Sequence, residues 1–120
     1  MKKALVVDDL RMHRTLIKGS LMILGFEVDL AEDGLQGMTS LKENPYDVIF
    51  SDIEMPNMNG FEFLARLRRD PRFRRLPVVM LSTLKDDTTI ARMKRLGANC
   101  YLTKPYTIDG IRKALKTLNF

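Results

Sequence analysis

The 120-residue chain has few of the side chains that form disulfides and soft-metal sites. It contains one cysteine, one histidine and no tryptophan. A single cysteine excludes an internal disulfide, and a single histidine excludes the multi-histidine sites that bind transition metals. Because disulfides are the mark of oxidising compartments, the near-absence of cysteine favours a reducing cytoplasm.

Long apolar runs are also missing. The first apolar run, residues 4–7, ends at two aspartates, which makes it too short for a signal peptide. No stretch approaches the roughly 18 apolar residues that a membrane-spanning helix needs. We therefore expect no membrane segment.

The charge is basic, with 20 lysines and arginines against 15 acids. Much of the excess lies in one short segment that holds Arg66, Arg68, Arg69, Arg72, Arg74 and Arg75. A basic excess raises the expectation of an anionic partner. The segment has only one aromatic residue, Phe73, which is too few to stack the successive bases of a single strand. We interpret it as a solvated helix end and loop, and we expect no nucleic-acid partner.

The sequence does contain five alternations of short apolar runs with segments of helical spacing. The apolar runs cover residues 4–7, 26–30, 47–50, 78–81 and 99–103. After each run, apolar residues recur every three or four positions, as Ile108, Ile111 and Leu115 do. Gly25 and Gly97 stand where helices commonly end. With no repeat or linker in between, the pattern predicts one α/β domain of five βα units over residues 1–120.

The composition of the runs indicates the order of the strands. Runs 4–7, 47–50 and 78–81 are continuously apolar, as is typical of strands covered on both faces. Runs 26–30 and 99–103 alternate apolar with polar residues, which suits edge strands. With right-handed crossovers, this predicts a doubly wound parallel sheet of order 2-1-3-4-5, the flavodoxin-like order. Ligands of such sheets bind beyond the carboxyl ends of the strands.

Polar residues stand at those predicted strand ends. They are Asp8, Asp9, Asp52, Ser82 and Lys104. Closely packed carboxylates repel one another, and a hard cation with oxygen ligands, such as Mg²⁺, relieves the repulsion. One aspartate can then attack phosphorus while the lysine and the serine bind phosphoryl oxygens. Each residue alone is more often a cap or a surface charge, but their joint placement favours phosphoryl chemistry.

Four blocks of the sequence resemble the response-regulator receiver domain of two-component signalling. They are residues 6–9 (VVDD), 51–60 (SDIEMPNMNG), 81–83 (LST) and 104–105 (KP). The spacing between the blocks is similar too, so the resemblance covers the whole chain and implies a CheY-like fold. The second block is similar to receivers of the chemotaxis system, including those attached to CheA kinases or found in CheV-type couplers.

The resemblance implies a role for each residue of the phosphoryl site. Asp52 would be the phosphoacceptor, Lys104 the cation that binds the phosphoryl group, and Ser82 the switch hydroxyl. Tyr101 would be the aromatic residue that changes rotamer on activation.

The resemblance also implies the ligands of Mg²⁺. Asp9 would bind the ion directly, and Asp8 would act mainly through water. Asp52 and the backbone carbonyl of Glu54 would complete the site.

Three residues near the implied phosphoacceptor depart from the commonest receiver pattern. Thr83 is bulkier than the usual alanine or glycine and narrows the access to Asp52. Glu54 adds negative charge beside the anionic centre, and Leu84 has no polar group to orient a water. We expect all three to slow hydrolysis of the acyl phosphate, unless Glu54 acts as a general base and speeds it.

Three backbone features are also expected. The resemblance leads us to expect a cis peptide between Lys104 and Pro105, because the lysine points back while the chain turns away. Leu10 stands where a hydroxyl residue often caps the first helix, so Asp8 or Asp9 would have to supply any cap. Gly60 allows a turn into the next helix that a Cβ would obstruct.

Three functions remain open. The first is a phosphorylation-activated switch that receives its phosphoryl group from a sensor histidine kinase, CheA-like in a chemotaxis pathway. Its output face would comprise the helix around Ile90 and Met93, the strand over 99–103 and the helix over 108–118. The second is a phosphate sink that drains a shared kinase, and the sequence does not separate it from the switch.

The third is a small phosphatase of the haloacid-dehalogenase type, with residues 52–54 as the nucleophile motif and Asp86–Asp87 as late acids. The short chain, the missing cap domain and the poor second acid disfavour it. We expect a protein that phosphorylates and dephosphorylates its own aspartate, and not an enzyme that turns over a separate substrate.

Overall fold

The sheet has the strand order that the sequence predicts. In the computed structural model, which describes residues 1–120, five parallel strands pair in the order β2-β1-β3-β4-β5. The strands are β1 (Lys2–Val7), β2 (Phe26–Ala31), β3 (Val48–Asp52), β4 (Val78–Ser82) and β5 (Cys100–Thr103). The helices between and after them are α1 (Arg11–Ile23), α2 (Gly34–Glu43), α3 (Gly60–Arg69), α4 (Asp87–Arg95) and α5 (Ile108–Thr117).

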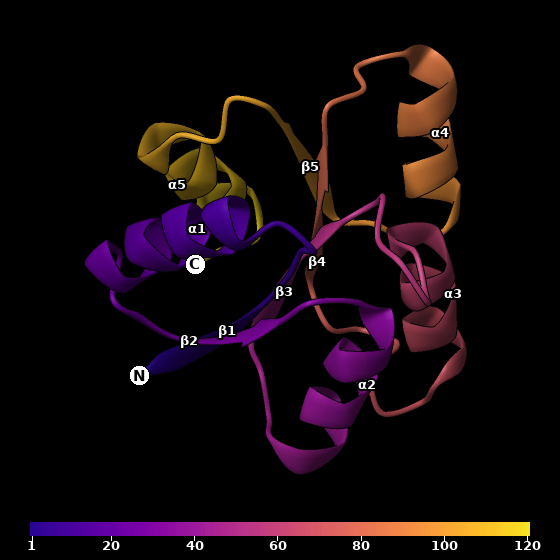
Figure 1. The fold of residues 1–120 in the computed structure, drawn as a ribbon, viewed down its shortest axis with the longest axis horizontal. Coiled ribbons are helices and arrows are strands. Elements are labelled where there is room, and N and C mark those ends of the chain that lie inside the picture. Colours follow the sequence, from indigo (N-terminus) through magenta and orange to yellow (C-terminus); the bar gives the residue numbers. More distant parts are fainter.

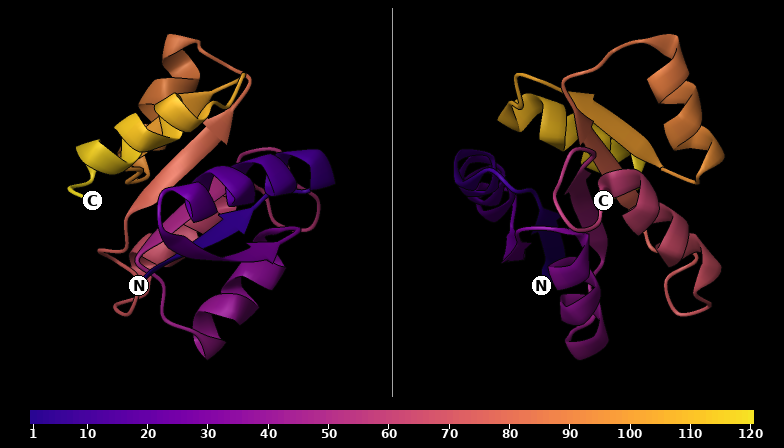
Figure 2. Two further views of the ribbon diagram at one scale, coloured as in Figure 1. Left: turned by 90° about the vertical axis from the view of Figure 1, so that its left-hand side faces the viewer. Right: turned by 45° about the vertical axis from the view of Figure 1, so that its right-hand side comes forward.

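The helices cover both faces of the sheet (Figures 1 and 2). On one face α1 and α5 bury their apolar sides against Ala4 and Val6 of β1 and against the matching residues of β3 and β4. On the other face α2, α3 and α4 pack against Leu5, Val7 and their neighbours. Successive residues of the central strands thus point to opposite cores, which explains their continuously apolar runs. None of the five helices has the length and apolar character needed to cross a membrane.

The strands extend further than the apolar runs suggest. β3 continues through Asp52 and β4 through Ser82, so both residues end strands instead of following them. The reason is backbone pairing: Asp52 is in register with Leu81, and Ser82 with Thr103. Hydrogen bonding to a neighbouring strand holds a polar residue in the sheet that hydrophobicity alone would exclude.

Four of the five helices begin at a side-chain cap. The capping residues are Asp33, Asn59, Asp86 and Thr107. The first helix is different, because its N-cap Leu10 offers no side-chain acceptor. The expectation that Asp8 or Asp9 caps this helix is wrong. The Asp8 carboxylate accepts a hydrogen bond from the backbone N–H of Leu10, which lies before the first helical turn.

The Lys104–Pro105 peptide is cis, as expected, and the two predicted helix-ending glycines, Gly25 and Gly97, have positive φ angles of 92° and 98°. Gly60 has the close approach that the sequence suggested. A Cβ at this position would lie 2.1 Å from the backbone oxygen of Asp52, and the Gly60 N–H donates to the carbonyl of Ile53 at 2.7 Å. The start of α3 is therefore pressed against the end of β3.

The arginine-rich segment is only partly a solvated surface. Arg68 is half-buried and donates to the carbonyls of Gly97 and Phe73 and to the side-chain oxygen of Asn99, at 3.0, 3.1 and 2.9 Å. It thereby ties α3 to the loops before β4 and β5. For Arg68 the interpretation as a solvated charge is wrong, because its three acceptors converge only in the folded chain.

The close approach of α3 to the end of β3 at Gly60 leads to a prediction about the stability of the protein. Gly60→Ala should lower the free energy of unfolding by at least about 2 kcal/mol, because backbone atoms would have to move apart. Gly19→Ala is the matched control: nothing lies within 4 Å of its added Cβ, and alanine should stabilise the exposed helix by about 0.5–1 kcal/mol. Urea unfolding followed by circular dichroism measures both, and equal effects of the two variants would contradict the prediction.

Candidate functional site

The predicted site residues surround a small crevice at the carboxyl edge of the sheet. Its volume is about 130 Å³, and it is lined by Asp9, Leu10, His13, Asp52, Ile53, Glu54, Ser82, Thr83, Leu84 and Lys104. Asp52 and Ser82 are the last residues of β3 and β4, His13 lies in α1, and the others come from the loops after β1, β3, β4 and β5. They meet because parallel strands end at the same edge. Of the predicted residues only Asp8, which is buried beneath the crevice, and Tyr101 are not part of its lining.

Three carboxylates lie close together here. Oxygen atoms of Asp8, Asp9 and Asp52 lie within 4.8 Å of one another. Asp8 is buried, Asp52 is partly buried, and Asp9 is exposed. No lysine or arginine forms an ion pair with any of them. Only His13, which lies beside Asp8, offers a nearby group that can carry positive charge in an ion pair. A set of hard oxygen donors of this kind fits a hard divalent cation.

The electrostatics of the site follow from this crowding. Burial, reinforced by the neighbouring Asp8 carboxylate, raises the pKa of Asp52 to about 7. The backbone N–H of Ile53 donates to Asp52 at 2.8 Å and opposes the rise in pKa. Burial also raises the pKa of Asp8. Near neutral pH, and in the absence of a divalent cation, the Asp52 carboxyl is therefore partly protonated. A divalent cation that bound there would displace this proton.

Two side chains of α1 hold Asp8 in place, and sequence reasoning missed both. His13 Nδ1 lies 3.1 Å from a carboxylate oxygen of Asp8, and the Arg14 guanidinium donates to its backbone carbonyl at 2.7 Å. The ring of Tyr106 meets the His13 ring edge-on, with 5.6 Å between centroids. Their position in the sequence could have indicated both residues, because α1 begins two residues after Asp9 and its first turns therefore lie beside the aspartate pair.

Ser82 and Lys104 reach the crevice from β4 and from the end of β5. The buried Ser82 hydroxyl oxygen accepts a hydrogen bond from the Leu84 N–H at 2.9 Å, so its own O–H is free to donate elsewhere. Lys104 donates its backbone N–H to the Ser82 carbonyl at 3.2 Å, and its side chain lines the crevice. Both side chains are thus positioned to donate hydrogen bonds to an anion beside Asp52.

The remaining predicted residues divide into two groups. Glu54, Thr83 and Leu84 are exposed and line the crevice beside Asp52. Tyr101 lies apart from them on β5, with 36% of its surface exposed. Together with Met93 it lines a separate cavity of about 160 Å³.

Comparison with known proteins agrees with this geometry. The family model of the response regulator receiver domain matches residues 4–116. The chain is 36% identical over 117 residues to the probable chemotaxis protein CheY of Rhizobium etli, covering 97% of this chain and 91% of that protein.

Solved structures show the same similarity. The chemotaxis protein CheY4 of Vibrio cholerae superposes with a TM-score of 0.91 at 34% identity, and the match covers 97% of each chain. The receiver domain of sensor histidine kinase PA1611 from Pseudomonas aeruginosa superposes with a TM-score of 0.88 at 27% identity, covering 99% of this chain and 98% of the other. That structure is described with a magnesium ion coordinated in its active-site cleft.

The raised pKa of Asp52 makes a prediction about stability and pH. The folded-state pKa of about 7 exceeds the ordinary value of 3.8, so the folded state binds the proton more tightly, and stability falls as pH rises from about 4 to about 7. The shift is equivalent to at most about 4 kcal/mol. Screening by water in the crevice reduces it, and Asp52→Asn should stabilise the metal-free protein by about 1–2 kcal/mol at pH 8.

Urea unfolding with a chelator at pH 5 and pH 8 measures this effect. The gain from Asp52→Asn should be smaller at pH 5, where the wild-type carboxyl is largely protonated. Asp87→Asn, at an exposed carboxylate on α4, is the control. A gain that is the same at both pH values would show that burial does not perturb Asp52.

Proposed function

This chain belongs to the response-regulator receiver domain family, and from that premise we propose that it is a phosphorylation-activated signalling switch. Proteins of this family act in signalling, and two of the three relatives reported above are chemotaxis proteins, so we propose a role in chemotaxis or motility. The observation that carries the proposal is the crevice in which Asp52, Ser82 and Lys104 face one another beside two further aspartates. Its partners would be a sensor histidine kinase, of CheA type in a chemotaxis pathway, and a downstream protein, in the cytoplasm.

Asp52 is the nucleophile in this proposal. One of its carboxylate oxygens attacks the phosphorus of a kinase phosphohistidine. The new P–O bond forms an acyl phosphate while the P–N bond breaks, and the imidazole leaves with the electron pair and takes up a proton. Ser82 and Lys104 donate hydrogen bonds to the phosphoryl oxygens. Because the product stays on the protein, the chain is a phosphoacceptor and not a turnover enzyme.

The acidic residues would hold Mg²⁺. Asp9 and Asp52 would bind it directly, Asp8 through water, and Glu54 through its backbone carbonyl. Support comes from the three clustered carboxylates, which form no ion pair with a lysine or arginine, and from the magnesium ion described for the Pseudomonas aeruginosa relative. When bound, the ion supplies positive charge that offsets the repulsion between Asp52 and the incoming phosphoryl group.

The switch would run from Ser82 to Tyr101. A phosphoryl group on Asp52 would attract the Ser82 hydroxyl away from the Leu84 N–H, which loosens the loop before α4. Tyr101 is exposed beside a cavity and has room to turn inward. This coupling favours a switch over a phosphate sink, because a sink needs no second conformation.

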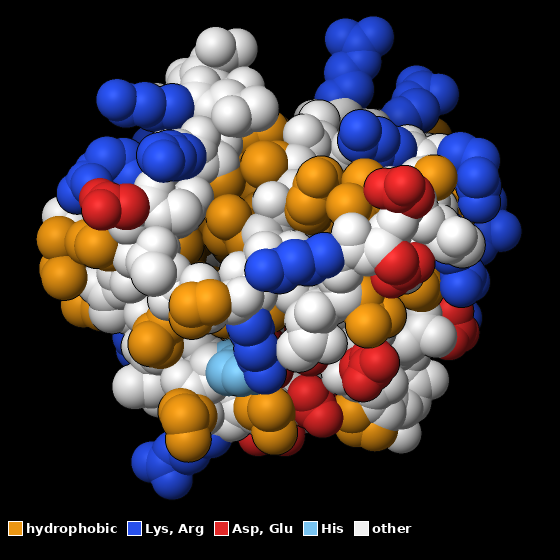
Figure 3. All heavy atoms as spheres, turned by 90° about the horizontal axis from the view of Figure 1, so that it is seen from above, with side chains coloured by type: hydrophobic (Ala, Val, Ile, Leu, Met, Phe, Trp, Pro, Cys, Tyr) orange, Lys and Arg blue, Asp and Glu red, His pale blue; other side chains and the backbone are white.

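The output face would comprise α4, β5 and α5. Arg92, Arg95, Arg112 and Lys113 give it exposed cations. Figure 3 looks down on the side where α4 and α5 lie and shows basic side chains around apolar ones. An acidic segment with apolar residues would complement such a face.

The proposal predicts a signal that spreads from the crevice. Addition of Mg²⁺ and beryllofluoride, which stands in for a phosphoryl group on Asp52, should shift the NMR amide resonances around the crevice and of Tyr101. Asp52→Ala should abolish all of these shifts. Ser82→Ala should keep the shifts at the crevice and lose those at Tyr101.

Two controls accompany this experiment. Asp87→Asn should respond as wild type, and mass spectrometry after acetyl phosphate should show one added phosphoryl group that Asp52→Ala lacks. A phosphorylated Asp52→Ala protein would contradict the assignment of the acceptor. Wild-type shifts confined to the crevice would favour the phosphate sink.

The exposed residues that line the crevice lead to a prediction about the lifetime of a phosphoryl group on Asp52. Hydrolysis needs a water molecule in line behind phosphorus. Glu54 adds negative charge to this approach and Thr83 and Leu84 add bulk, but none of the three provides a fixed group that orients the water. Replacing both Glu54 with Asn and Thr83 with Ala should therefore speed the first-order decay of phosphoprotein severalfold. Glu62→Gln, at an exposed acid on α3, should leave the rate unchanged. Slower decay in the double variant would instead identify Glu54 as a general base.

A further inference from the structure

The net charge of the protein is concentrated at one place. Residues 66–77 contain six arginines and one aspartate, so their net charge equals the +5 of the whole chain, and the remainder is balanced. Because Asp52 and Ser82 end their strands whereas residues 70–77 lead into β4, the end of this segment lies at the sheet edge opposite the phosphorylation crevice.

Two of the six arginines have partners within the fold, and of the other four, Arg74 and Arg75 lie in the loop before β4. Arg68 binds three acceptors within the fold, and Arg72 pairs with Asp70 at 2.8 Å. Arg74 and Arg75 are exposed and form no ion pair. Neighbouring cations without acidic partners repel one another, so folding alone does not explain them.

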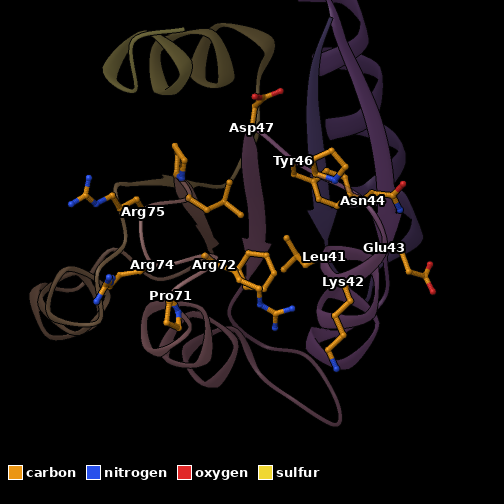
Figure 4. A pocket seen from close by; sticks show the side chains of 14 residues that line it. Leu41, Lys42, Glu43, Asn44, Tyr46, Asp47, Pro71, Arg72, Arg74 and Arg75 are labelled. Carbon is orange, nitrogen blue, oxygen red and sulfur yellow. The ribbon is translucent and has the colours of Figure 1, made fainter.

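A large surface groove lies beside these arginines. It has a volume of about 760 Å³ and runs between residues 41–47 and 71–77, which we name the basic groove. In Figure 4, Arg74 and Arg75 lie on one side of it and Lys42 and Glu43 on the other, and the charged ends of these four side chains extend outward from its centre. Three cations without ion pairs therefore border the basic groove.

The floor of the basic groove is apolar and held in place. Leu41 is buried and lies near the centre of the view in Figure 4. Tyr46 and Phe73, which also line the groove, are half-buried. The Tyr46 hydroxyl lies 2.6 Å from a carboxylate oxygen of Asp29, and the Lys3 ammonium lies 5.3 Å from the centre of the Tyr46 ring. The charged residues that line the groove are four cations, Lys42, Arg72, Arg74 and Arg75, and two acids, Glu43 and Asp47. A recessed apolar floor under a rim with this excess of cations is complementary to an apolar side chain flanked by carboxylates.

We propose that the basic groove docks an acidic peptide segment of a protein partner, with one large apolar side chain on its floor. A nucleic-acid backbone would use the cations but leave the floor empty. A membrane would need apolar side chains that protrude, whereas these are recessed. The docking is independent of the proposed phosphorylation, since it occurs at the opposite edge of the sheet.

A defined peptide tests the proposal on the full chain. The probe is a short peptide with a central phenylalanine flanked by acidic residues, titrated into labelled protein and followed by NMR. Shifts should be confined to residues 41–47 and 71–77. Changing both Arg74 and Arg75 to Glu should weaken binding at least about tenfold, and replacing the peptide's phenylalanine with alanine should weaken it at least about fivefold.

Reversing Arg11 and Lys18 of α1 to Glu gives a control of equal charge change, which should alter affinity less than about twofold. Mg²⁺ with beryllofluoride should leave affinity unchanged, and the groove variant should still be phosphorylated by acetyl phosphate, so this proposal and the switch can fail separately. No binding at millimolar peptide, equal binding without the phenylalanine, or tighter binding of a DNA duplex or phosphatidylserine vesicles at these residues would overturn the proposal.

Discussion

Repulsion between carboxylates at the end of a parallel sheet is the constraint on which the candidate site depends. The sheet brings Asp8, Asp9 and Asp52 together, and burial leaves two of them with raised pKa values. A site of this kind costs stability when it is empty and gains it when a cation or a proton enters. The same repulsion therefore makes the site responsive to what binds there.

The surrounding structure holds these carboxylates in place. Asp8 is fixed by hydrogen bonds from α1 and from the turn before it. On the other side, the loop after β3 is tied to the start of α2, where the side chain of Asn57 donates to the Asp33 carboxylate at 2.7 Å. Gly60 then presses α3 against the end of β3. Asp52 thus stands at the end of a paired strand, while in the neighbouring loop after β4 the Leu84 N–H donates to the Ser82 hydroxyl.

The two edges of the sheet carry opposite charge. The carboxyl edge gathers aspartates that suit a cation and a phosphoryl group, and the other edge gathers the arginines that make the chain basic. Because side chains at opposite edges are separated by the length of the strands, each edge can bind a different partner with little direct interaction. The phosphoryl transfer and the peptide docking that we propose would in this way use separate ends of one sheet.

By itself the sequence determined the strand order, the convergence of the polar residues and the need for glycine at position 60. These features could be predicted because the spacing of apolar residues and the identity of turn residues are local properties of the sequence. Only the tertiary structure decided where the strands end, since Asp52 and Ser82 stay in the sheet through pairing with neighbours. It also decided the roles of His13 and Arg68. Their partners include Asp8, Gly97 and Asn99, and such contacts exist only once helices have packed. The basic groove lies between the end of α2 with the loop after it and the loop before β4, about 30 residues apart in sequence, and no local pattern predicts a groove of that kind.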